Sequence, residues 1–415
     1  MKKEPRLHLP KVPARPGEEP DFSYVSVSAA GAVARPEIQT RARDMMSLSV
    51  DMVRVLDDQG EAQGPWNPHL DPADLQVGLR HMLLTRIYDD RMQRTQRAGK
   101  ISFYMRSLGE EAVSVAACMA LKPGDMLFPS YRNQGLHICR GLPLVEMMCQ
   151  LLSNTHDMCK GRQLPVMYHS RAGNLFSISG NLATQFPQAV GWAMAAAIKG
   201  EDHLAASWLG EGSSAEADFH QALLFASVYQ APAILNVVNN QWAISTFQGY
   251  AGGEQRSFAG RGPGYGMPGI RVDGNDFLAV YAVTQWAAER ARTGHGPTLI
   301  ELVTYRAAAH STSDDPARYR AKDDAQHWPL GDPIERLKRH LIKLGQWSEA
   351  RHEKLVQELE SLVAASWKEA TGYGTMNEGP RLNADLMFED VFKEIPEHLK
   401  RQQAQMRAEK GAKHG

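Results

Sequence analysis

The residues best suited to chemistry follow two apolar runs. Gly210-Glu211-Gly212 comes after the first run, and Asn240 ends the second, 29 residues beyond Glu211. Carboxylate and amide oxygens that meet at the carboxyl edges of neighbouring strands can bind a hard cation such as Mg²⁺. The two glycines let the backbone approach a ligand, and a helix that starts there offers N–H groups to an anion. This segment predicts a site for a metal-bound phosphate or diphosphate.

A βαβ unit would position these groups. We predict strands at residues 203–209 and 233–238, one on each side of a helix. Ser213 and Glu216 have the S-x-x-E spacing of a capping box, so we expect the helix to begin there. Its buried face would be made by Phe219, Ala222, Leu223 and Ala226.

The same glycines permit another interpretation. Residues 210–215 match the G-x-G-x-x-A sequence of nicotinamide and flavin enzymes. Those enzymes place an acidic residue about 20 positions further on, at the end of the next strand. Here that strand ends in Asn239 and Asn240, without a carboxylate. The metal-phosphate interpretation is therefore favoured, and an NAD-dependent dehydrogenase is the alternative.

The composition is that of a soluble globular protein. Of 415 residues, 43% are hydrophobic, and 46 Lys and Arg against 47 Asp and Glu give a formal net charge of −1. Without a net positive field we expect no nucleic-acid partner. Four cysteines without C-x-x-C spacing favour reduced thiols. No apolar run reaches the roughly 18 residues of a membrane span, and residues 1–20 lack the apolar part of a secretory signal. We expect a cytoplasmic protein without a membrane partner.

The chain has three segments that differ in residue pattern. Residues 1–70 have short alternating runs separated by Pro and Gly, which predicts an extended N-terminal arm. In residues 71–345 helical stretches alternate with β-rich runs, including 270–272 and 298–303. Residues 346–415 form a charged helical tail. The alternation predicts an α/β fold with a mostly parallel sheet flanked by helices.

The central segment opens with a long predicted helix. Pro72 and Asp74 supply the start signals. Apolar residues at helical spacing would make its buried face: Leu75, Leu79, Met82, Leu83 and Ile87.

The wider sequence resembles a known family. Asn239-Asn240-Gln241-Trp242-Ala243-Ile244-Ser245-Thr246, after Gly210-Glu211-Gly212, is similar to the thiamin diphosphate motif of α subunits of the decarboxylase-dehydrogenase component of 2-oxo acid dehydrogenase complexes. The branched-chain type is the most similar. Further matching segments occur in order at 102–105, 109–111, 131–132, 161–165, 178–185, 261–266, 271–276 and 310–315. The resemblance implies the thiamin-diphosphate-binding fold, oxidative decarboxylation of branched-chain 2-oxo acids such as 3-methyl-2-oxobutanoate, and reductive acylation of a lipoyl domain.

The resemblance also implies cofactor roles, position by position. Glu211, Asn240 and the backbone carbonyl of Trp242 would bind Mg²⁺. The groups expected around the diphosphate are Tyr131, Arg132, Gly210, Gly212 and Ser213.

A second loop would serve the other end of the cofactor. Gly180 and Leu182 would face the aminopyrimidine ring. A K⁺ ion that orders this loop would be held by Ser179, Asn181, Thr184 and Gln185. Asn181 stands where some relatives have proline.

His310 matches the active-site histidine of the family, which donates to the diphosphate near the reacting carbon. Relatives that act on pyruvate tend to have a further histidine two positions earlier, where this chain has Ala308. That difference favours branched-chain substrates, with a pyruvate or acetoin dehydrogenase α subunit as the alternative. Ser311 and Ser313 match positions phosphorylated in mitochondrial relatives. Here we expect the Ser, Thr and Asp residues to cap a following helix.

The resemblance implies protein partners as well. Enzymes with this chemistry need a second α/β domain for the pyrimidine, and one such domain is visible in the sequence. A β subunit would supply it in an α2β2 heterotetramer, with the arm and tail wrapping that subunit. The acyl group would pass to the lipoyl domain of a dihydrolipoyl acyltransferase. A non-catalytic structural subunit is disfavoured because His310 and the expected metal ligands are present.

Overall fold

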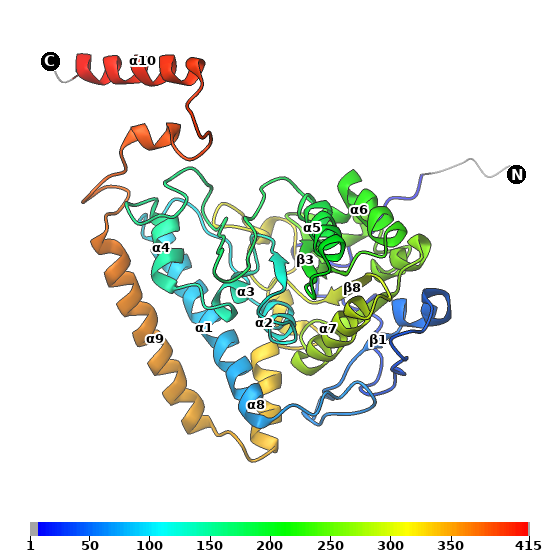
Figure 1. Ribbon diagram of the computed structural model, residues 1–415. Helices are drawn as coiled ribbons and strands as arrows, with labels where there is room; N and C mark the ends of the chain where they lie inside the picture. The colour runs from blue at the N-terminus through cyan, green and yellow to red at the C-terminus, as the bar shows by residue number, and fades with distance from the viewer. Residues whose placement is uncertain (1–6, 414–415) are drawn as a thin grey trace, which may run out of the picture.

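A six-stranded parallel sheet is the centre of the molecule. The computed structural model describes residues 7–413, and Figure 1 shows helices on both faces of the sheet. The strand order is β1-β7-β8-β4-β3-β2, with every pairing in this sheet parallel. The strands are β1 (Met52–Val53), β2 (Met126–Phe128), β3 (Ala205–Gly210), β4 (Ala233–Asn239), β7 (Gly269–Asp273) and β8 (Thr298–Val303). The predicted α/β class is confirmed, and the four predicted strands are β3, β4, β7 and β8.

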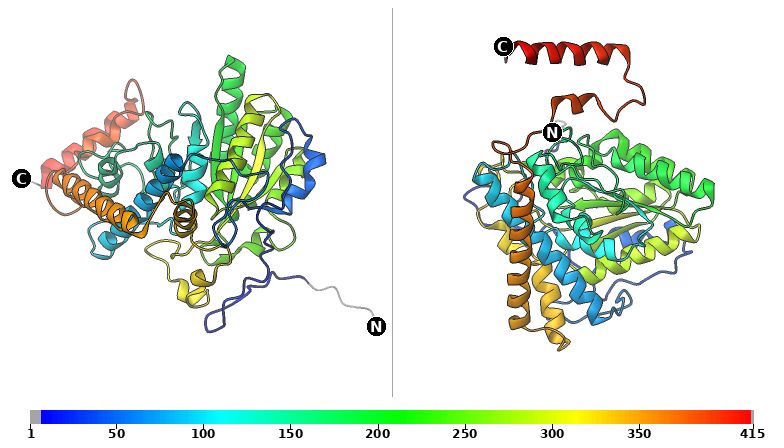
Figure 2. Two further views of the ribbon diagram at one scale, coloured as in Figure 1. Left: turned by 90° about the horizontal axis from the view of Figure 1, so that it is seen from below. Right: turned by 60° about the vertical axis from the view of Figure 1, so that its left-hand side comes forward.

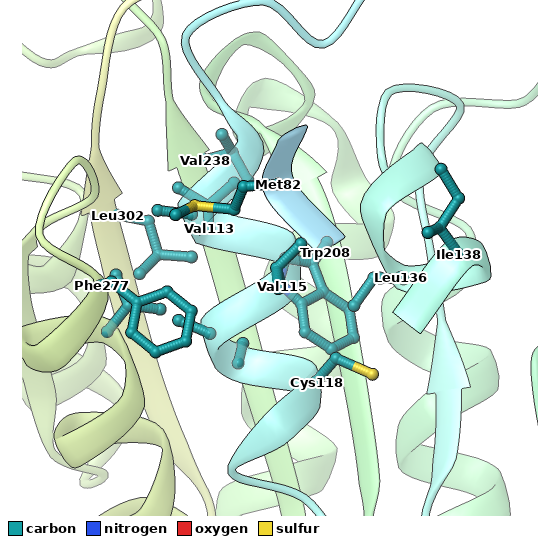
Figure 3. Close-up of a cluster of buried hydrophobic side chains, with 14 of the residues drawn as sticks. Met82, Val113, Val115, Cys118, Leu136, Ile138, Trp208, Val238, Phe277 and Leu302 are labelled. Atoms are coloured by element: carbon teal, nitrogen blue, oxygen red, sulfur yellow. The ribbon is translucent and has the colours of Figure 1, made fainter. Parts of the chain in front are cut away.

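The strands form because both of their faces are buried. All residues of β4 and β8 are buried, as expected of parallel strands covered by helices. Successive side chains point to opposite faces, so Trp208 and Val238 join one core, whereas Leu209 and Val237 join the other. The first core is drawn in Figure 3, where Met82, Val113 and Phe277 lie close to these strand residues.

The helices divide between the two faces. The first core contains residues of α1 (Pro72–Arg97), α2 (Glu111–Met119) and α7 (Phe277–Arg292). The second contains residues of α5 (Gln185–Lys199) and α6 (Ala217–Val228). The remaining α-helices described are α3 (Gln134–Cys139), α4 (Leu144–Leu152), α8 (Pro333–Lys343), α9 (Glu349–Gly372) and α10 (Glu397–Lys413). Within residues 7–413, no helix is both long and apolar enough to cross a membrane.

Helix α1 begins where the sequence predicts. Asp71 is its N-cap, and the Asp71 side chain accepts a hydrogen bond from the backbone N–H of Ala73. Pro72 takes the first helical position, where the missing N–H costs nothing. Four of the five predicted face residues are buried, and Ile87 packs partly buried against the same core.

The described part of the arm, residues 7–70, lies on the sheet domain. Strand β1 pairs with β7, so the arm supplies one edge of the sheet. Trp66 of the arm contacts Trp286 of α7, with ring centroids 6.2 Å apart. Phe22 packs edge-on against Tyr305 and Trp328. These contacts explain how an arm with little secondary structure is ordered. Residues 1–6 of the predicted arm lie outside the described residues.

The C-terminal tail contains two α-helices, α9 and α10. Helix α9 packs beside α1 and α4, and Figure 2 shows it running along the side of the domain. It ends at Gly372. Helix α10 projects beyond the domain and is tied to a short turn by Arg407, which pairs with Asp385. The division of the chain at residues 70 and 345 stays a prediction.

Candidate active site

The loop after β3 differs in one respect from the prediction. Residues Glu211–Ala215 form a 3₁₀ turn, in which the hydroxyl of Ser214 donates to the carbonyl of Glu211. Helix α6 therefore starts only at Ala217, with Glu216 as its N-cap and no side-chain capping bond. The predicted capping box is wrong, because the turn places Ser213 too early to cap the helix. The anion-facing backbone at Gly210–Gly212 belongs to this turn rather than to α6.

The sheet brings Glu211 and Asn240 together. Gly210 at the end of β3 is level with Val238 of β4, so the residues that follow both strands meet at one edge. The backbone N–H of Asn240 points to Oε2 of Glu211, 3.4 Å away. Both side chains are more than nine-tenths buried. The proximity predicted from the strand ends is thus present, whereas the metal role of both residues stays a prediction.

Glu211 has an unsatisfied oxygen. Its Oε1 is buried and has no hydrogen-bond partner within residues 7–413. The pKa of Glu211 is raised from 4.5 to about 7, mainly by burial; the neighbouring Glu110 carboxylate contributes to the rise, and Arg306 opposes it. A buried carboxylate with a free oxygen is costly without a cation, so the donor set suits Mg²⁺.

The carbonyl of Trp242 lies beside this pair. It accepts a hydrogen bond of 2.8 Å from Nη1 of Arg306. A carbonyl oxygen has two lone pairs, so this bond leaves one for a metal ion. Asn240 Oδ1 accepts from the backbone N–H of Trp242 at 3.3 Å, which joins the two expected ligands in one turn.

Arg132 and His310 form one wall of the cleft. Nη2 of Arg132 donates to the carbonyl of His310 at 2.9 Å and lies 3.3 Å from its Nδ1. Because a guanidinium group only donates, Nδ1 is the acceptor and Nε2 of His310 carries the hydrogen. The ring of Tyr131 lies edge-on to His310, with centroids 6.0 Å apart.

Positive charge dominates this wall. Burial, together with Arg132 and Arg306, lowers the pKa of His310 from 6.5 to about 3, so the imidazole is neutral. Burial and Arg132 also lower the pKa of Arg306. Two buried guanidinium groups and a backbone turn next to a histidine are suited to an anionic diphosphate, whose charge would raise the pKa of His310 again.

The loop of residues 179–185 closes the cleft on a further side. Thr184 donates its hydroxyl hydrogen to the carbonyl of Asn181 at 3.0 Å, and Ser179 Oγ accepts from the N–H of Asn181. Gln185 Nε2 donates to the carbonyl of Trp208, while its Oε1 is buried without a partner within residues 7–413. Leu182 is 48% exposed and lines the cleft. The cluster of oxygens is compatible with a monovalent cation, which stays a prediction.

Most of these residues line one open cleft of about 470 Å³, whereas Thr184 and Arg306 are not part of its lining. Gly180 and Gly210 both line it, and a Cβ added at either position would meet no atom within 4 Å. The open space beside the Gly210 backbone is where a bound diphosphate would lie. Apolar side chains also contribute to the lining: Met105, Leu164, Met167, Leu182 and Ile244.

Two residues of the site were missed from the sequence. Arg306 is almost fully buried and also donates to the carbonyl of Ile244, so it braces the turn after β4. Glu110 is 2% exposed, and its Oε1 accepts from Nδ2 of Asn240 at 2.9 Å. Arg306 comes three residues after β8, at the same sheet edge as Asn240, and that position was the available signal.

The comparison with known proteins now decides the family. A family model described as the dehydrogenase E1 component matches residues 79–378, and a model of the 2-oxoisovalerate dehydrogenase E1 alpha subunit N terminal matches residues 3–43. The chain belongs to the dehydrogenase E1 component family. Membership implies thiamin diphosphate as cofactor and an enzyme that is a 2-oxo acid dehydrogenase. It also sets aside the nicotinamide interpretation of residues 210–215.

Relatives within the dehydrogenase E1 component family cover nearly the whole chain. The chain is 58% identical over 401 residues to the 2-oxoisovalerate dehydrogenase subunit alpha of Pseudomonas aeruginosa, covering 97% of this chain and 98% of that protein. It is 38% identical over 358 residues to the mitochondrial 2-oxoisovalerate dehydrogenase subunits alpha of Mus musculus and Homo sapiens. Those matches cover 85% of this chain and 79% and 78% of the relatives. The resemblance drawn from the motifs is confirmed.

Proposed function

We propose that this chain is the α subunit of a branched-chain 2-oxo acid dehydrogenase. It would take part in oxidative decarboxylation of branched-chain 2-oxo acids and in reductive acylation of a lipoyl domain. The observation that carries the proposal is the 58% identity, over 97% of this chain, to a protein named 2-oxoisovalerate dehydrogenase subunit alpha. The cytoplasmic location predicted above stays a prediction.

The expected cofactor would be held by residues already placed around the cleft. Mg²⁺ would bind Glu211, Asn240 and the carbonyl of Trp242, and the diphosphate would lie between this metal and Arg132. K⁺ would bind the oxygens around Gln185, whose buried Oε1 lacks a partner within residues 7–413. When bound, thiamin diphosphate supplies the nucleophilic carbon and the electron sink for decarboxylation.

His310 would act as a proton donor in the cleft. Its Nδ1 accepts from Arg132, so Nε2 carries the ring hydrogen, and the residue lines the cleft. The N–H of His310 donates to Asp314 at 2.7 Å, which fixes the backbone that carries the imidazole. A positioned donor of this kind can assist proton transfer at the reacting atoms.

A β subunit would complete the site. In the described part of the chain, the carboxylates that line the cleft are Glu110 and Glu211, and both lie beside Asn240 on the metal side. Activation of the aminopyrimidine needs another carboxylate, so we propose that a β subunit supplies it in an α2β2 heterotetramer. The lipoyl domain of a dihydrolipoyl acyltransferase would then receive the acyl group.

The loop after His310 is compatible with a structural role for its hydroxyl groups. Ser311 Oγ accepts from the N–H of Ser313, and Asp315 caps the short turn at Pro316–Arg318. Capping, as expected from the sequence, therefore accounts for the end of this run. Whether Ser311 or Ser313 is phosphorylated stays an open prediction.

The substrate is tested with the assembled αβ pair. Apolar residues such as Met105, Leu164 and Met167 line the cleft, and Ala308 stands where pyruvate-type relatives tend to have histidine. We expect a higher kcat/KM for 2-oxo acids derived from valine, leucine and isoleucine than for pyruvate, measured as Mg²⁺- and thiamin-diphosphate-dependent decarboxylation. A preference for pyruvate would support the alternative assignment.

A further inference from the structure

Glu110 lies immediately before helix α2. It is the N-cap of α2, yet its side chain forms no capping hydrogen bond. Side chains that cap helices are typically those of Ser, Thr, Asp or Asn, so the longer side chain of Glu110 is free to make other contacts. The Glu110 carboxylate instead points into the cleft and is almost fully buried. Burial of a carboxylate is costly, so its partners in the cleft indicate its role.

The first partner is the amide of Asn240. Glu110 Oε1 accepts from Asn240 Nδ2 at 2.9 Å, and Asn240 Oδ1 accepts from the backbone N–H of Trp242 at 3.3 Å. The two contacts select one orientation of the amide, because the reversed group would set an oxygen against the carboxylate and an NH₂ against an N–H. A cation is bound only by the amide oxygen. Glu110 therefore keeps the nitrogen of Asn240 away from the metal position.

The second partner is Arg132. The same Oε1 of Glu110 lies 3.6 Å from Nε of Arg132. The terminal nitrogens of Arg132 remain bonded to the carbonyls of Arg106 and His310. One buried carboxylate thus contacts an expected metal ligand and an expected diphosphate ligand at once.

We propose that Glu110 is a positioning residue that presets Asn240 and Arg132 for the metal and the diphosphate. The inference rests on the proposed function, since it assumes that Asn240 binds Mg²⁺ and that Arg132 faces the diphosphate. Glu110 would act through these two side chains rather than as a ligand. Its effect is to remove the need to reorient two side chains when the cofactor binds, which would appear in the binding constants.

The test compares Glu110→Ala with Glu110→Gln in the assembled α2β2 protein. Mg²⁺ is titrated at saturating thiamin diphosphate, and binding is followed by isothermal titration calorimetry and by tryptophan fluorescence, without turnover. Loss of a partner that orients a metal ligand commonly weakens metal binding by roughly 10- to 100-fold, and we expect that loss for Glu110→Ala. Glutamine retains an oxygen that can accept from Asn240, so Glu110→Gln should recover most of the affinity.

Glu111→Gln is the matched control. Glu111 is the next residue, is fully buried, and pairs with Arg86 and the N–H of Gly109 rather than with the cleft. Its substitution should lower thermal stability without changing the Mg²⁺ constant. An unchanged constant in Glu110→Ala, or an equal loss in Glu110→Ala and Glu110→Gln, overturns the positioning role.

Wild-type cofactor binding and the Glu211→Ala variant separate the role of Glu110 from the proposed function. If wild-type protein binds thiamin diphosphate with Mg²⁺ and Glu211→Ala weakens it, the metal site stands whatever Glu110 does. If the wild-type assembly shows no Mg²⁺-dependent binding of thiamin diphosphate, the proposed function fails and the role of Glu110 fails with it.

Discussion

Glu211 should make the protein less stable when no cofactor is bound. Burial is the main cause that raises the pKa of this carboxyl from 4.5 to about 7. At 1.36 kcal/mol for each tenfold change in the proton equilibrium, this rise corresponds to about 3 kcal/mol of destabilisation when the group is ionised. A raised carboxyl pKa makes the penalty absent below about pH 4.5 and complete above about pH 7.

The substitution that tests this is Glu211→Gln, which keeps the volume and removes the charge. At pH 8 and without cofactor, we expect the free energy of unfolding to rise by about 1 to 3 kcal/mol, since the buried glutamine NH₂ gives back part of the gain. At pH 5 the penalty on wild type should fall below about 1 kcal/mol, roughly a quarter of its full value, because the carboxyl is then mostly protonated in the native state. With Mg²⁺ and thiamin diphosphate near 100 times their Kd, wild type should gain about 2.7 kcal/mol and the variant clearly less.

The assay is thermal and urea unfolding of the assembled protein at both pH values, with and without Mg²⁺ and thiamin diphosphate. Glu216→Gln is the matched control, because Glu216 is exposed on the same loop and should change neither result. Two results together would contradict this prediction. Glu211→Gln would have to be less stable than wild type at pH 8 without cofactor, and the cofactor would have to stabilise the variant as strongly as wild type.

Three further predictions use other residues. His310→Ala should bind cofactor nearly normally but lose roughly 10²- to 10⁴-fold in reductive acylation of a lipoyl domain, and wild-type turnover would remove His310 from the chemistry. Gly210→Ala should fold normally, because the added methyl meets no atom within 4 Å, yet bind thiamin diphosphate more weakly; calorimetry showing unchanged affinity would contradict the placement of the diphosphate. Burial lowers the pKa of His137 from 6.5 to about 4, so stability should fall as pH drops from 6.5 towards 4, by up to about 3 kcal/mol. His137→Gln should remove that part of the pH dependence in urea unfolding, and identical wild-type and variant profiles would count against it.

The parts of the fold that follow from local pattern were predictable. Strand β8 was expected at residues 298–303 and occurs there, since this short run is mostly apolar and β-branched, as expected of a buried parallel strand, with Glu301 as its one charged residue. The meeting of Glu211 and Asn240 also followed, because both come directly after neighbouring parallel strands. Strands β1 and β2 were not predicted as strands of the sheet, since they are only two and three residues long and their pairing depends on tertiary contacts.

The parts that depend on tertiary contacts were not predictable. The S-x-x-E spacing of Ser213 and Glu216 indicated a capping box, but the 3₁₀ turn at Glu211–Ala215 uses those residues differently. Glu110 reaches Asn240 across 130 residues of sequence, and no local pattern announces such a contact. The contact exists only once the chain has folded.

We propose that this chain supplies the metal and diphosphate half of a site that a β subunit completes. This division of the site is tested most directly by decarboxylation of 3-methyl-2-oxobutanoate with Mg²⁺ and thiamin diphosphate, by the purified chain alone and after addition of the β subunit. We expect no decarboxylation and only weak thiamin diphosphate binding by the single chain, with both properties appearing in the pair. Substantial cofactor-dependent decarboxylation by the verified single chain would contradict it.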